Sequence, residues 1–331
     1  MEDERDMTAV IFANSASLES LILTEATLRL SRRTSGFRVL ALCDTAESSP
    51  LLPRPIALFA NQIRRVFDPA SRLPLKREMM WSLRSLARHY SIDLIVPPGR
   101  NINEPGFVRY LKQHLKPVLA LSYRCPQIFG KSLLGAFGTA VNNHGGTLPT
   151  YRGMSCLEWS IYNGEYETGF SYHYMTAGID EGPLLLTGEI PIDHRSLMEL
   201  RYDKAKLAAT QLETVLKAVA ARDPGTEQVG ESCYYSRAAA HRIRTIRQPF
   251  CITWEELRRR LRAFGSLVIE INGEAMEVTN LHCLGLDQPL RGSRSFVTAE
   301  GITVVATRFA SLPYGLYCLM RRWRNLVLAR R

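Results

Sequence analysis

The sequence predicts an α/β protein with a mostly parallel, Rossmann-like sheet that carries helices on both faces, followed by a smaller β-rich, OB-like domain. Two observations support this. In the first part of the chain, short apolar segments alternate with helical ones, which is typical of parallel sheets with crossover helices. After a polar linker at residues 222–232, short β-rich runs are broken by Asn-Gly and Glu-Gly turns. We therefore expect domains at residues 1–225 and 233–331.

Each element can be placed from its own pattern. Buried strands are continuous apolar runs bounded by breakers, and helices show apolar residues three or four apart. A threonine followed three residues later by glutamate starts the helix of the second domain, and a glycine ends it. The predicted strands of the first domain lie at residues 8–12, 37–44, 92–99, 116–123, 138–144, 168–175 and 182–192. One predicted helix begins near residue 17, and the others lie at residues 75–90, 105–115, 126–137, 196–221 and 253–265. The later β-rich runs lie at residues 267–284 and 295–310.

Composition excludes several classes of protein. The 331 residues contain no apolar run close to the ~20 residues of a membrane span, and the acidic start lacks a signal pattern, so we expect a cytoplasmic protein without membrane contact. Seven scattered cysteines without a CxxC pair argue against a disulfide framework and against a zinc site, so no metal is expected. The first strand lacks a GxGxxG turn and the chain lacks a P-loop, which argues against nicotinamide and P-loop nucleotide sites.

Positive charge is concentrated in the second domain. From Gly230 onward the chain has 16 Arg, no Lys and eight acidic residues, a net charge of +8 out of +10 for the whole chain. Such a domain suits contact with nucleic acid or another polyanion. Solvated helix faces would give the same composition. The tail at residues 318–331 is cationic and amphipathic, and we expect it to form a closing helix rather than a membrane contact.

A polar cluster follows the strand predicted at residues 138–144. Asn142 and His144 are two apart, so on a strand their side chains point the same way. Gly145 and Gly146 would let a ligand approach the backbone closely. Asp180 lies in a glycine-flanked loop after a later strand. An amide, an imidazole and a carboxylate at one cleft suit acyl-type transfer, because they can move protons and stabilise an oxyanion. From the residues alone, an Asn-x-His pair at a strand end is more often a loop cap than a site.

The stretch from Asn142 to Ile192 resembles the core of the 10-formyltetrahydrofolate-dependent formyltransferases. This family includes methionyl-tRNA formyltransferase, glycinamide ribonucleotide formyltransferase and the amino-sugar N-formyltransferases. The resemblance implies the formyltransferase fold for residues 1–225 and 10-formyltetrahydrofolate as co-substrate. It is carried by Asn-x-His at 142–144, Leu-Pro-x-Tyr-Arg-Gly at 148–153, Trp-x-Ile-x-Asn-Gly-Glu at 159–165, Thr-Gly at 168–169, His-x-Met at 173–175 and Asp-x-Gly at 180–182.

The resemblance also implies roles for individual residues. Asn142 and His144 would hold the formyl oxygen as it becomes an oxyanion, with His144 as an imidazolium that also returns a proton to the folate nitrogen. Asp180 would set the charge of His144 and take the proton of the attacking amine. Gly146 stands where the family commonly has a serine, which puts the acceptor pocket in doubt. The implied folate-binding residues are Ser122, Tyr123, Arg124, Cys125, Ile128, Gly178 and Ile179, and the implied acceptor-binding residues are Thr147, Tyr151 and Arg152.

The acceptor amine is predicted to belong to a small molecule, such as a nucleotide-linked amino sugar. His173 favours this class over methionyl-tRNA, because tRNA-type members typically have no histidine there, although His173 itself is interpreted as a packed core residue. The alternatives are methionyl-tRNA, which the basic second domain favours, and an ornithine-type or peptidyl amine in natural-product assembly. A homodimer is a further expectation, because appended domains of this size often serve pairing.

Overall fold

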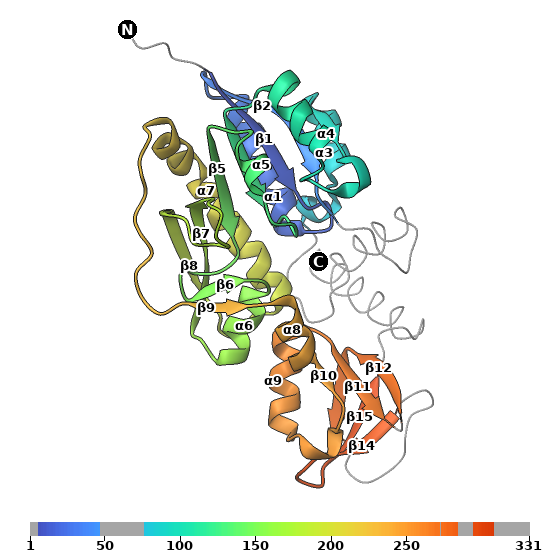
Figure 1. Ribbon diagram of the computed structural model, residues 1–331. Helices are drawn as coiled ribbons and strands as arrows, with labels where there is room; N and C mark the ends of the chain where they lie inside the picture. Colours follow the sequence, from blue (N-terminus) through green and yellow to red (C-terminus); the bar gives the residue numbers. More distant parts are fainter. Residues whose placement is uncertain (1–5, 47–75, 272, 284–293, 308–331) are drawn as a thin grey trace, which may run out of the picture. The chain divides into compact units, whose positions relative to one another are not determined.

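The computed structural model describes residues 6–46, 76–271, 273–283 and 294–307 (Figure 1). The chain divides into two compact units. The first comprises Met1–Cys156 and Tyr166–Tyr234, and the second comprises Leu157–Glu165 and Tyr235–Arg331. A short segment from the middle of the chain thus belongs to the second unit, which the sequence did not predict. The cationic tail at residues 318–331 lies outside the described residues.

A seven-stranded sheet forms the centre of the first unit, in the order β3-β2-β1-β4-β5-β7-β8. The strands β3, β2, β1, β4 and β5 run parallel to one another, whereas β7 pairs antiparallel with both β5 and β8. The strands are β1 (Met7–Ala13), β2 (Phe37–Asp44), β3 (Asp93–Ile95), β4 (Leu119–Tyr123), β5 (Thr139–His144), β7 (Glu167–Tyr174) and β8 (Leu184–Pro191), with the short β6 (Tyr151–Gly153) and β9 (Cys233–Tyr235) outside the sheet. The predicted mostly parallel sheet is confirmed.

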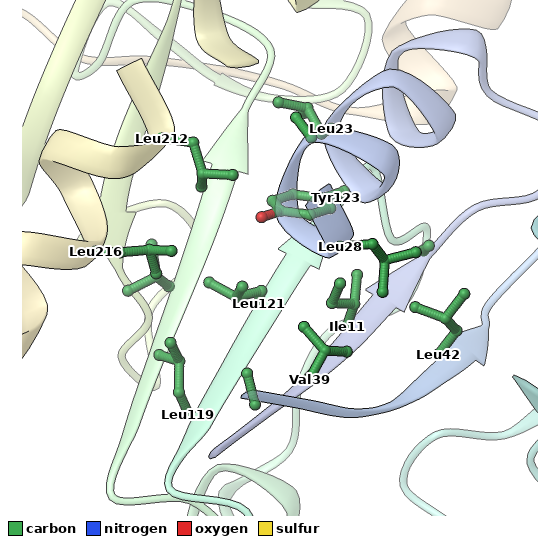
Figure 2. Packing of buried hydrophobic residues seen from close by; sticks show 14 of the residues in the cluster. Ile11, Leu23, Leu28, Val39, Leu42, Leu119, Leu121, Tyr123, Leu212 and Leu216 are labelled. Carbon is green, nitrogen blue, oxygen red and sulfur yellow. The ribbon is translucent and has the colours of Figure 1, made fainter. Parts of the chain in front are cut away.

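Helices cover both faces of this sheet. On one face, α1 (Leu18–Ser31), α3 (Leu83–Tyr90) and α7 (Leu197–Ala220) bury apolar side chains against β1, β2 and β4 (Figure 2). On the other, α4 (Pro105–Tyr110), its π-helical continuation Leu111–Leu115 and α5 (Lys131–Leu134) pack against Val10, Phe12 and Ala120. Continuous apolar strands are what such two-sided burial requires.

Caps explain where the main helices begin. The Ser17 side chain accepts a hydrogen bond from the Ser20 N–H at the start of α1, and Ser196 forms a capping box with Glu199 at the start of α7. Two predicted helices are shorter than expected. Residues 75–90 are split, because Trp81 is extended and Ser82 caps a new helix. Residues 126–137 form only α5, since the preceding segment is an irregular loop.

The second unit is β-rich, as predicted. It contains α6 (Cys156–Asn163, from Leu157), α8 (Arg237–Arg244), the 3₁₀ turn Pro249–Cys251, α9 (Trp254–Phe264) and the strands β10 (Thr245–Ile246), β11 (Leu267–Ile271), β12 (Glu274–Val278), β13 (Asn280–Cys283), β14 (Arg294–Val297) and β15 (Thr303–Thr307). The described strands form two three-stranded sheets, β10-β11-β12 and β13-β15-β14. OB-like closure stays a prediction.

The strand order reverses between β1 and β4, because β2 and β3 lie on one side of β1 and β4 and β5 on the other. In open parallel sheets, ligands bind beyond the carboxyl ends of the strands at such a reversal. The carboxyl ends of β1, β4 and β5 are Ala13, Tyr123 and His144. The fold thus brings the predicted site to the edge where a site is expected.

Within the described residues, no helix is long and apolar enough to cross a bilayer.

Candidate active site

His144, the last residue of β5, is buried with both ring nitrogens engaged. Its Nε2 lies 2.6 Å from the carbonyl oxygen of Tyr151. A carbonyl only accepts hydrogen bonds, so Nε2 carries a proton in this arrangement. In a neutral ring, Nδ1 then holds the lone pair, and it lies 3.4 Å from Oδ2 of Asp180. The structure therefore fixes which nitrogen of His144 can take up a proton.

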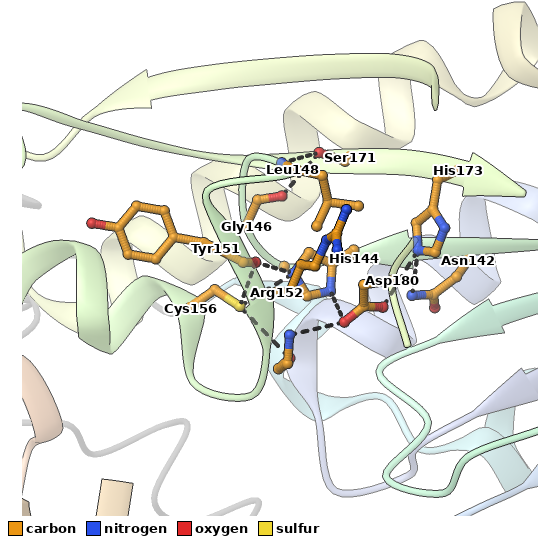
Figure 3. Close-up of polar contacts among 12 residues, drawn as sticks. Asn142, His144, Gly146, Leu148, Tyr151, Arg152, Cys156, Ser171, His173 and Asp180 are labelled. Carbon is orange, nitrogen blue, oxygen red and sulfur yellow. Dashed lines mark hydrogen bonds and ion pairs between the residues drawn. The ribbon is translucent and has the colours of Figure 1, made fainter. Parts of the chain in front are cut away.

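Asp180 lies between two imidazoles (Figure 3). Its Oδ2 faces His144 and accepts a hydrogen bond of 2.9 Å from the Gly153 N–H, while its Oδ1 lies 3.5 Å from Nε2 of His173. The backbone of Asp180 has φ of 55°, a conformation that aspartate tolerates better than most residues. The Gln228 side chain donates to the carbonyl of Asp180 at 2.9 Å. The carboxylate is thus held from both sides.

His173 and Asn142 face each other across the antiparallel pair of β5 and β7, in direct register. The Asn142 Nδ2 lies 3.2 Å from Nε2 of His173. The other ring nitrogen, Nδ1, donates to the carbonyl of Tyr174 at 2.8 Å. His173 is buried, as interpreted from the sequence, but its partners are Asn142 and Asp180, so it belongs to the polar site rather than to the apolar core.

Burial and charge set the ionisation of the pair. Burial lowers the pKa of His144 to about 4, even though the nearby Asp180 raises it. Burial raises the pKa of Asp180, but the neighbouring His144 and His173 and the hydrogen bond from the Gly153 N–H outweigh it and hold this pKa at about 2. At neutral pH the site thus holds a neutral imidazole beside a carboxylate.

The sequence suggests that Gly145 and Gly146 let a ligand approach the backbone. In the structure, however, these glycines leave no open space. A Cβ on Gly145 would lie 2.4 Å from Nη1 of Arg124. A Cβ on Gly146 would lie 2.7 Å from Cβ of Cys156 and 2.9 Å from the carbonyl oxygen of Tyr151. The protein itself fills both spaces. Glycine at 146 lets the chain bring the Tyr151 carbonyl to His144, because contacts below 3.0 Å would force that carbonyl to move.

Cys156 also contacts the site. Its Sγ lies 3.2 Å from Nε2 of His144 and 3.3 Å from the carbonyl oxygen of Tyr151. Ser171 supports the same turn, since its hydroxyl donates to the Gly146 carbonyl at 3.0 Å and accepts from the Leu148 N–H at 3.0 Å. The Leu148–Pro149 peptide bond is cis. These contacts tie the β5–β6 turn to β7.

The predicted folate-binding residues lie at the carboxyl end of β4, in the loop that follows it, and in the loop between β7 and β8. Ser122 pairs in register with Asn142. The side chain of Tyr123 is fully buried and bonds to Thr27, so only its backbone is left for a ligand. Ile128 is 62 % exposed and Ile179 is 37 % exposed. Arg124 and Cys125 are half-buried in the loop after β4, and Gly178 is half-buried in the loop between β7 and β8.

The predicted acceptor-binding residues surround the β5–β6 turn. Thr147 is half-buried, and the Tyr151 side chain is buried while its carbonyl holds His144. Arg152 donates to the Gln228 side chain at 2.8 Å and lies 3.6 Å from Glu181. The structure therefore gives Arg152 a place in bracing the loop of Asp180.

Sequence reasoning overlooked Cys156 and Gln228 and did not place His173 beside Asn142 and Asp180. The antiparallel pairing of β5 with β7 was the missing signal for His173, because it places His173 opposite Asn142. Gln228 lies in the predicted linker, where no pattern marks it. Across the described ranges, no three His, Cys, Asp or Glu side chains gather as a metal site would require.

Comparison with known proteins bears on this geometry. Residues 100–215 match the family model described as formyl transferase. The GDP-perosamine N-formyltransferase of Brucella melitensis is 38% identical over 121 residues, which cover 36% of this chain and 46% of that protein. The methionyl-tRNA formyltransferase of Acetivibrio thermocellus is 30% identical over 187 residues, which cover 56% of this chain and 57% of that protein. The chain thus spans about half the length of the curated relatives it matches.

Solved structures show the same fold. A sugar N-formyltransferase from Shewanella sp. has a TM-score of 0.57 at 18% identity, covering 83% of this chain and 97% of that one. The N-formyltransferase of Helicobacter canadensis, solved with folinic acid and dTDP-3-aminofucose, has a TM-score of 0.54 at 16% identity, covering 92% and 99%. At these identities the likeness concerns the fold. The residues matched by the family model include Asn142, His144 and Asp180.

Proposed function

We propose that this chain is an N-formyltransferase that moves a formyl group from 10-formyltetrahydrofolate to the amine of a small molecule, a nucleotide-linked amino sugar. The observation that carries the proposal is the cluster around the half-buried carboxylate of Asp180, which faces both His144 and His173, with Asn142 in contact with His173. The reaction joins the amine nitrogen to the formyl carbon, breaks the bond from that carbon to the folate nitrogen, and passes a proton from one nitrogen to the other. A site for this reaction needs a proton acceptor and an oxyanion donor.

The proton acceptor is the pair of His144 and Asp180. Nδ1 of the neutral imidazole and Oδ2 of the carboxylate lie 3.4 Å apart, and in the tautomer fixed by Tyr151 both are acceptors. An N–H donor placed between them satisfies both. An ordinary amine has a pKa near 10 and is protonated at neutral pH, so the attacking amine must first give up a proton to this pair. His144 therefore gains its positive charge during the reaction instead of holding it at rest.

The oxyanion donor is Asn142. Its amide lies beside His173, whose Nε2 holds the lone pair because Nδ1 donates to the Tyr174 carbonyl. One N–H of Asn142 is thus directed to His173, and the second is left for a ligand. Removal of a single donor of this kind costs about 3–4 kcal/mol of transition-state stabilisation in well-studied enzymes.

The loop that carries Ile128, after β4, suits a flat heterocycle. Gln127 anchors the first loop by accepting from the Ile102 N–H at 3.2 Å and donating to the Arg100 carbonyl at 2.9 Å. The Asn103 side chain donates to the Ile128 carbonyl at 2.9 Å. The backbone is thereby fixed while the Ile128 side chain stays exposed, which suits an aromatic ring that needs main-chain hydrogen bonds and an apolar surface.

Relatives with named substrates support an amino-sugar acceptor. The similarity to GDP-perosamine N-formyltransferase gives the highest identity among the proteins compared above, and the Helicobacter canadensis structure holds dTDP-3-aminofucose. Methionyl-tRNA is the second candidate, because methionyl-tRNA formyltransferases also match and the second unit is rich in arginine. Phosphate contacts of a tRNA would require such a basic surface, but the diphosphate of a nucleotide sugar is attracted equally.

An acceptor comparison tests this proposal. The full chain with 10-formyltetrahydrofolate is offered GDP- and dTDP-linked amino sugars, ornithine and methionyl-tRNA in separate reactions. Tetrahydrofolate is followed by absorbance and the product by mass. Formylation of a nucleotide-linked amino sugar supports the proposal. Formylation of methionyl-tRNA or ornithine alone assigns the acceptor to one of the alternatives, and the absence of transfer to all four contradicts the function.

A further inference from the structure

A buried ionic cluster lies directly behind His144. The Nζ of Lys204, on α7, donates to the carbonyl of Gly145 at 2.8 Å and lies 3.5 Å from Oε1 of Glu19, on α1. The other carboxylate oxygen of Glu19 lies 3.5 Å from Nε of Arg124. Lys204 is 3 % exposed and Glu19 is 5 % exposed. Two cations thus share one carboxylate, and one of them holds the peptide that follows His144.

Stability alone does not explain such a cluster. Charges removed from water carry a desolvation penalty that their attraction often fails to recover, and apolar residues of similar size are then neutral or stabilising. Burial raises the pKa of Glu19, but Arg124 and Lys204 lower it further, so the carboxylate stays ionised. What the cluster does achieve is local. It links α1, α7 and the residues that follow β4 and β5, through the ion pairs of Glu19 with Arg124 and Lys204 and the hydrogen bond of Lys204 to the Gly145 carbonyl.

The sequence of the turn is adapted to the cluster. A Cβ at Gly145 would lie 2.4 Å from Nη1 of Arg124, so glycine leaves the room that this guanidinium occupies, while Nζ of Lys204 would lie at an ordinary contact distance of 3.5 Å. Arg124 has φ of 58°, and its carbonyl accepts from the Asn14 side chain at 3.3 Å. The position of the guanidinium is therefore coupled to the absence of a side chain at 145.

We propose that Lys204, together with Glu19, is a positioning residue for His144 in the formyl transfer proposed above. By fixing the Gly145 carbonyl, it fixes the backbone that carries the imidazole between the Tyr151 carbonyl and Asp180. Lys204 and Glu19 act on the geometry of His144 without touching the substrate. Loss of Lys204 then changes the tautomer and the rate, while the binding of 10-formyltetrahydrofolate changes little.

Lys204→Met tests this, with Lys206→Met as the matched control. Lys206 lies on the same helix and also faces a glutamate, Glu78, at 3.3 Å, but on the surface. The proposal expects Lys204→Met to lower kcat by about tenfold or more, as small misplacements in a site do, with KM for the folate changed less than about threefold. Lys206→Met leaves both unchanged. A folded Lys204→Met variant with kcat within twofold of the original chain would overturn the proposal.

A second readout does not depend on activity. In ¹⁵N NMR of histidine-labelled protein, the original chain should show His144 with its proton on Nε2, and Lys204→Met should show a mixture of tautomers. An unchanged Nε2–H signal contradicts the positioning role even if no acceptor is formylated. If the original chain formylates no acceptor but Lys204→Met still changes the tautomer of His144, the positioning role is supported and only the proposed function is refuted. Glu19→Gln replaces Lys204→Met if the latter fails to fold.

The coupling between Gly145 and Arg124 gives an independent test. Gly145→Ala is made in the original chain and in Arg124→Ala. Because the added methyl group meets the guanidinium, its effect on kcat should be at least about fivefold larger when Arg124 is present. Equal effects in both backgrounds would show that Arg124 does not occupy the space beside Gly145 and would overturn this part of the proposal.

Discussion

Nδ1 of His144 lies 3.4 Å from Oδ2 of Asp180, while the other nitrogen of the ring donates to the Tyr151 carbonyl. The ring is therefore fixed with its lone pair facing a carboxylate. Oδ1 of the same carboxylate faces Nε2 of His173, whose Nδ1 donates to a carbonyl as well. Two imidazoles held by main-chain carbonyls thus present acceptors around one charge. Each prediction below rests on this arrangement.

His144→Gln should abolish most of the activity and preserve the fold. Glutamine can still donate to the Tyr151 carbonyl but cannot take up a proton. General acid–base groups contribute about 10²–10⁴-fold, so kcat should fall within that range. Steady-state kinetics measures it, with circular dichroism as the check on folding. A variant within tenfold of the original rate would exclude His144 as the proton acceptor.

Stability should depend on pH through His144. Its pKa is about 4 in the folded chain, below its ordinary value of 6.5, so the unfolded chain binds a proton first as pH falls. Stability is full above pH 6.5 and declines between 6.5 and 4, by about 3 kcal/mol at the limit. Asp180, with a folded pKa of about 2 against 3.8, adds a further loss between pH 3.8 and 2.

Urea unfolding at pH 7 and pH 4.5 checks this dependence. The original chain should lose about 2–3 kcal/mol more than His144→Gln between these two pH values, because the variant has no imidazole to protonate at this position. The same loss in both proteins would mean that other groups control the acid sensitivity.

His173→Ala should lower kcat by about tenfold or more, because Asn142 and Asp180 both lose a partner. KM for the folate should change little, and His173→Gln should recover part of the rate by keeping a hydrogen bond to Asn142. His194→Ala, at an exposed histidine, is the control. If His173→Ala has normal kinetics, His173 is the core residue that the sequence suggested.

Gly146→Ala should disturb the site through Tyr151. The added Cβ would meet the Tyr151 carbonyl oxygen at 2.9 Å and push it from His144. We expect kcat to fall by about tenfold or more, while Gly164→Ala, where a Cβ meets open space, affects only local stability through its positive φ. Kinetics of the two variants side by side gives the answer, and equal rates would show that the turn absorbs the methyl group.

The sequence predicts the α/β fold well because β1, β2, β4 and β5 are continuous apolar runs between helical segments. Residues two apart on a strand explain why Asn142 and His144 could be paired in advance. Positions that depend on long-range contact were not predictable. The His173 ring reaches Asn142 only through antiparallel register, and Gln228 reaches Asp180 from the supposed linker. Gly145 looked like room for a ligand, but its space belongs to Arg124 from another strand end.

The most direct test of the central claim is transfer by Asp180→Asn beside the original chain, with 10-formyltetrahydrofolate and a nucleotide-linked amino sugar. Asparagine keeps the shape of the carboxylate and removes its charge. The claim predicts that the original chain yields tetrahydrofolate and formylated sugar in equal amounts, and that the folded variant is slower by about 10²-fold or more. Comparable rates for the two proteins would contradict the role of Asp180 and with it the site described above.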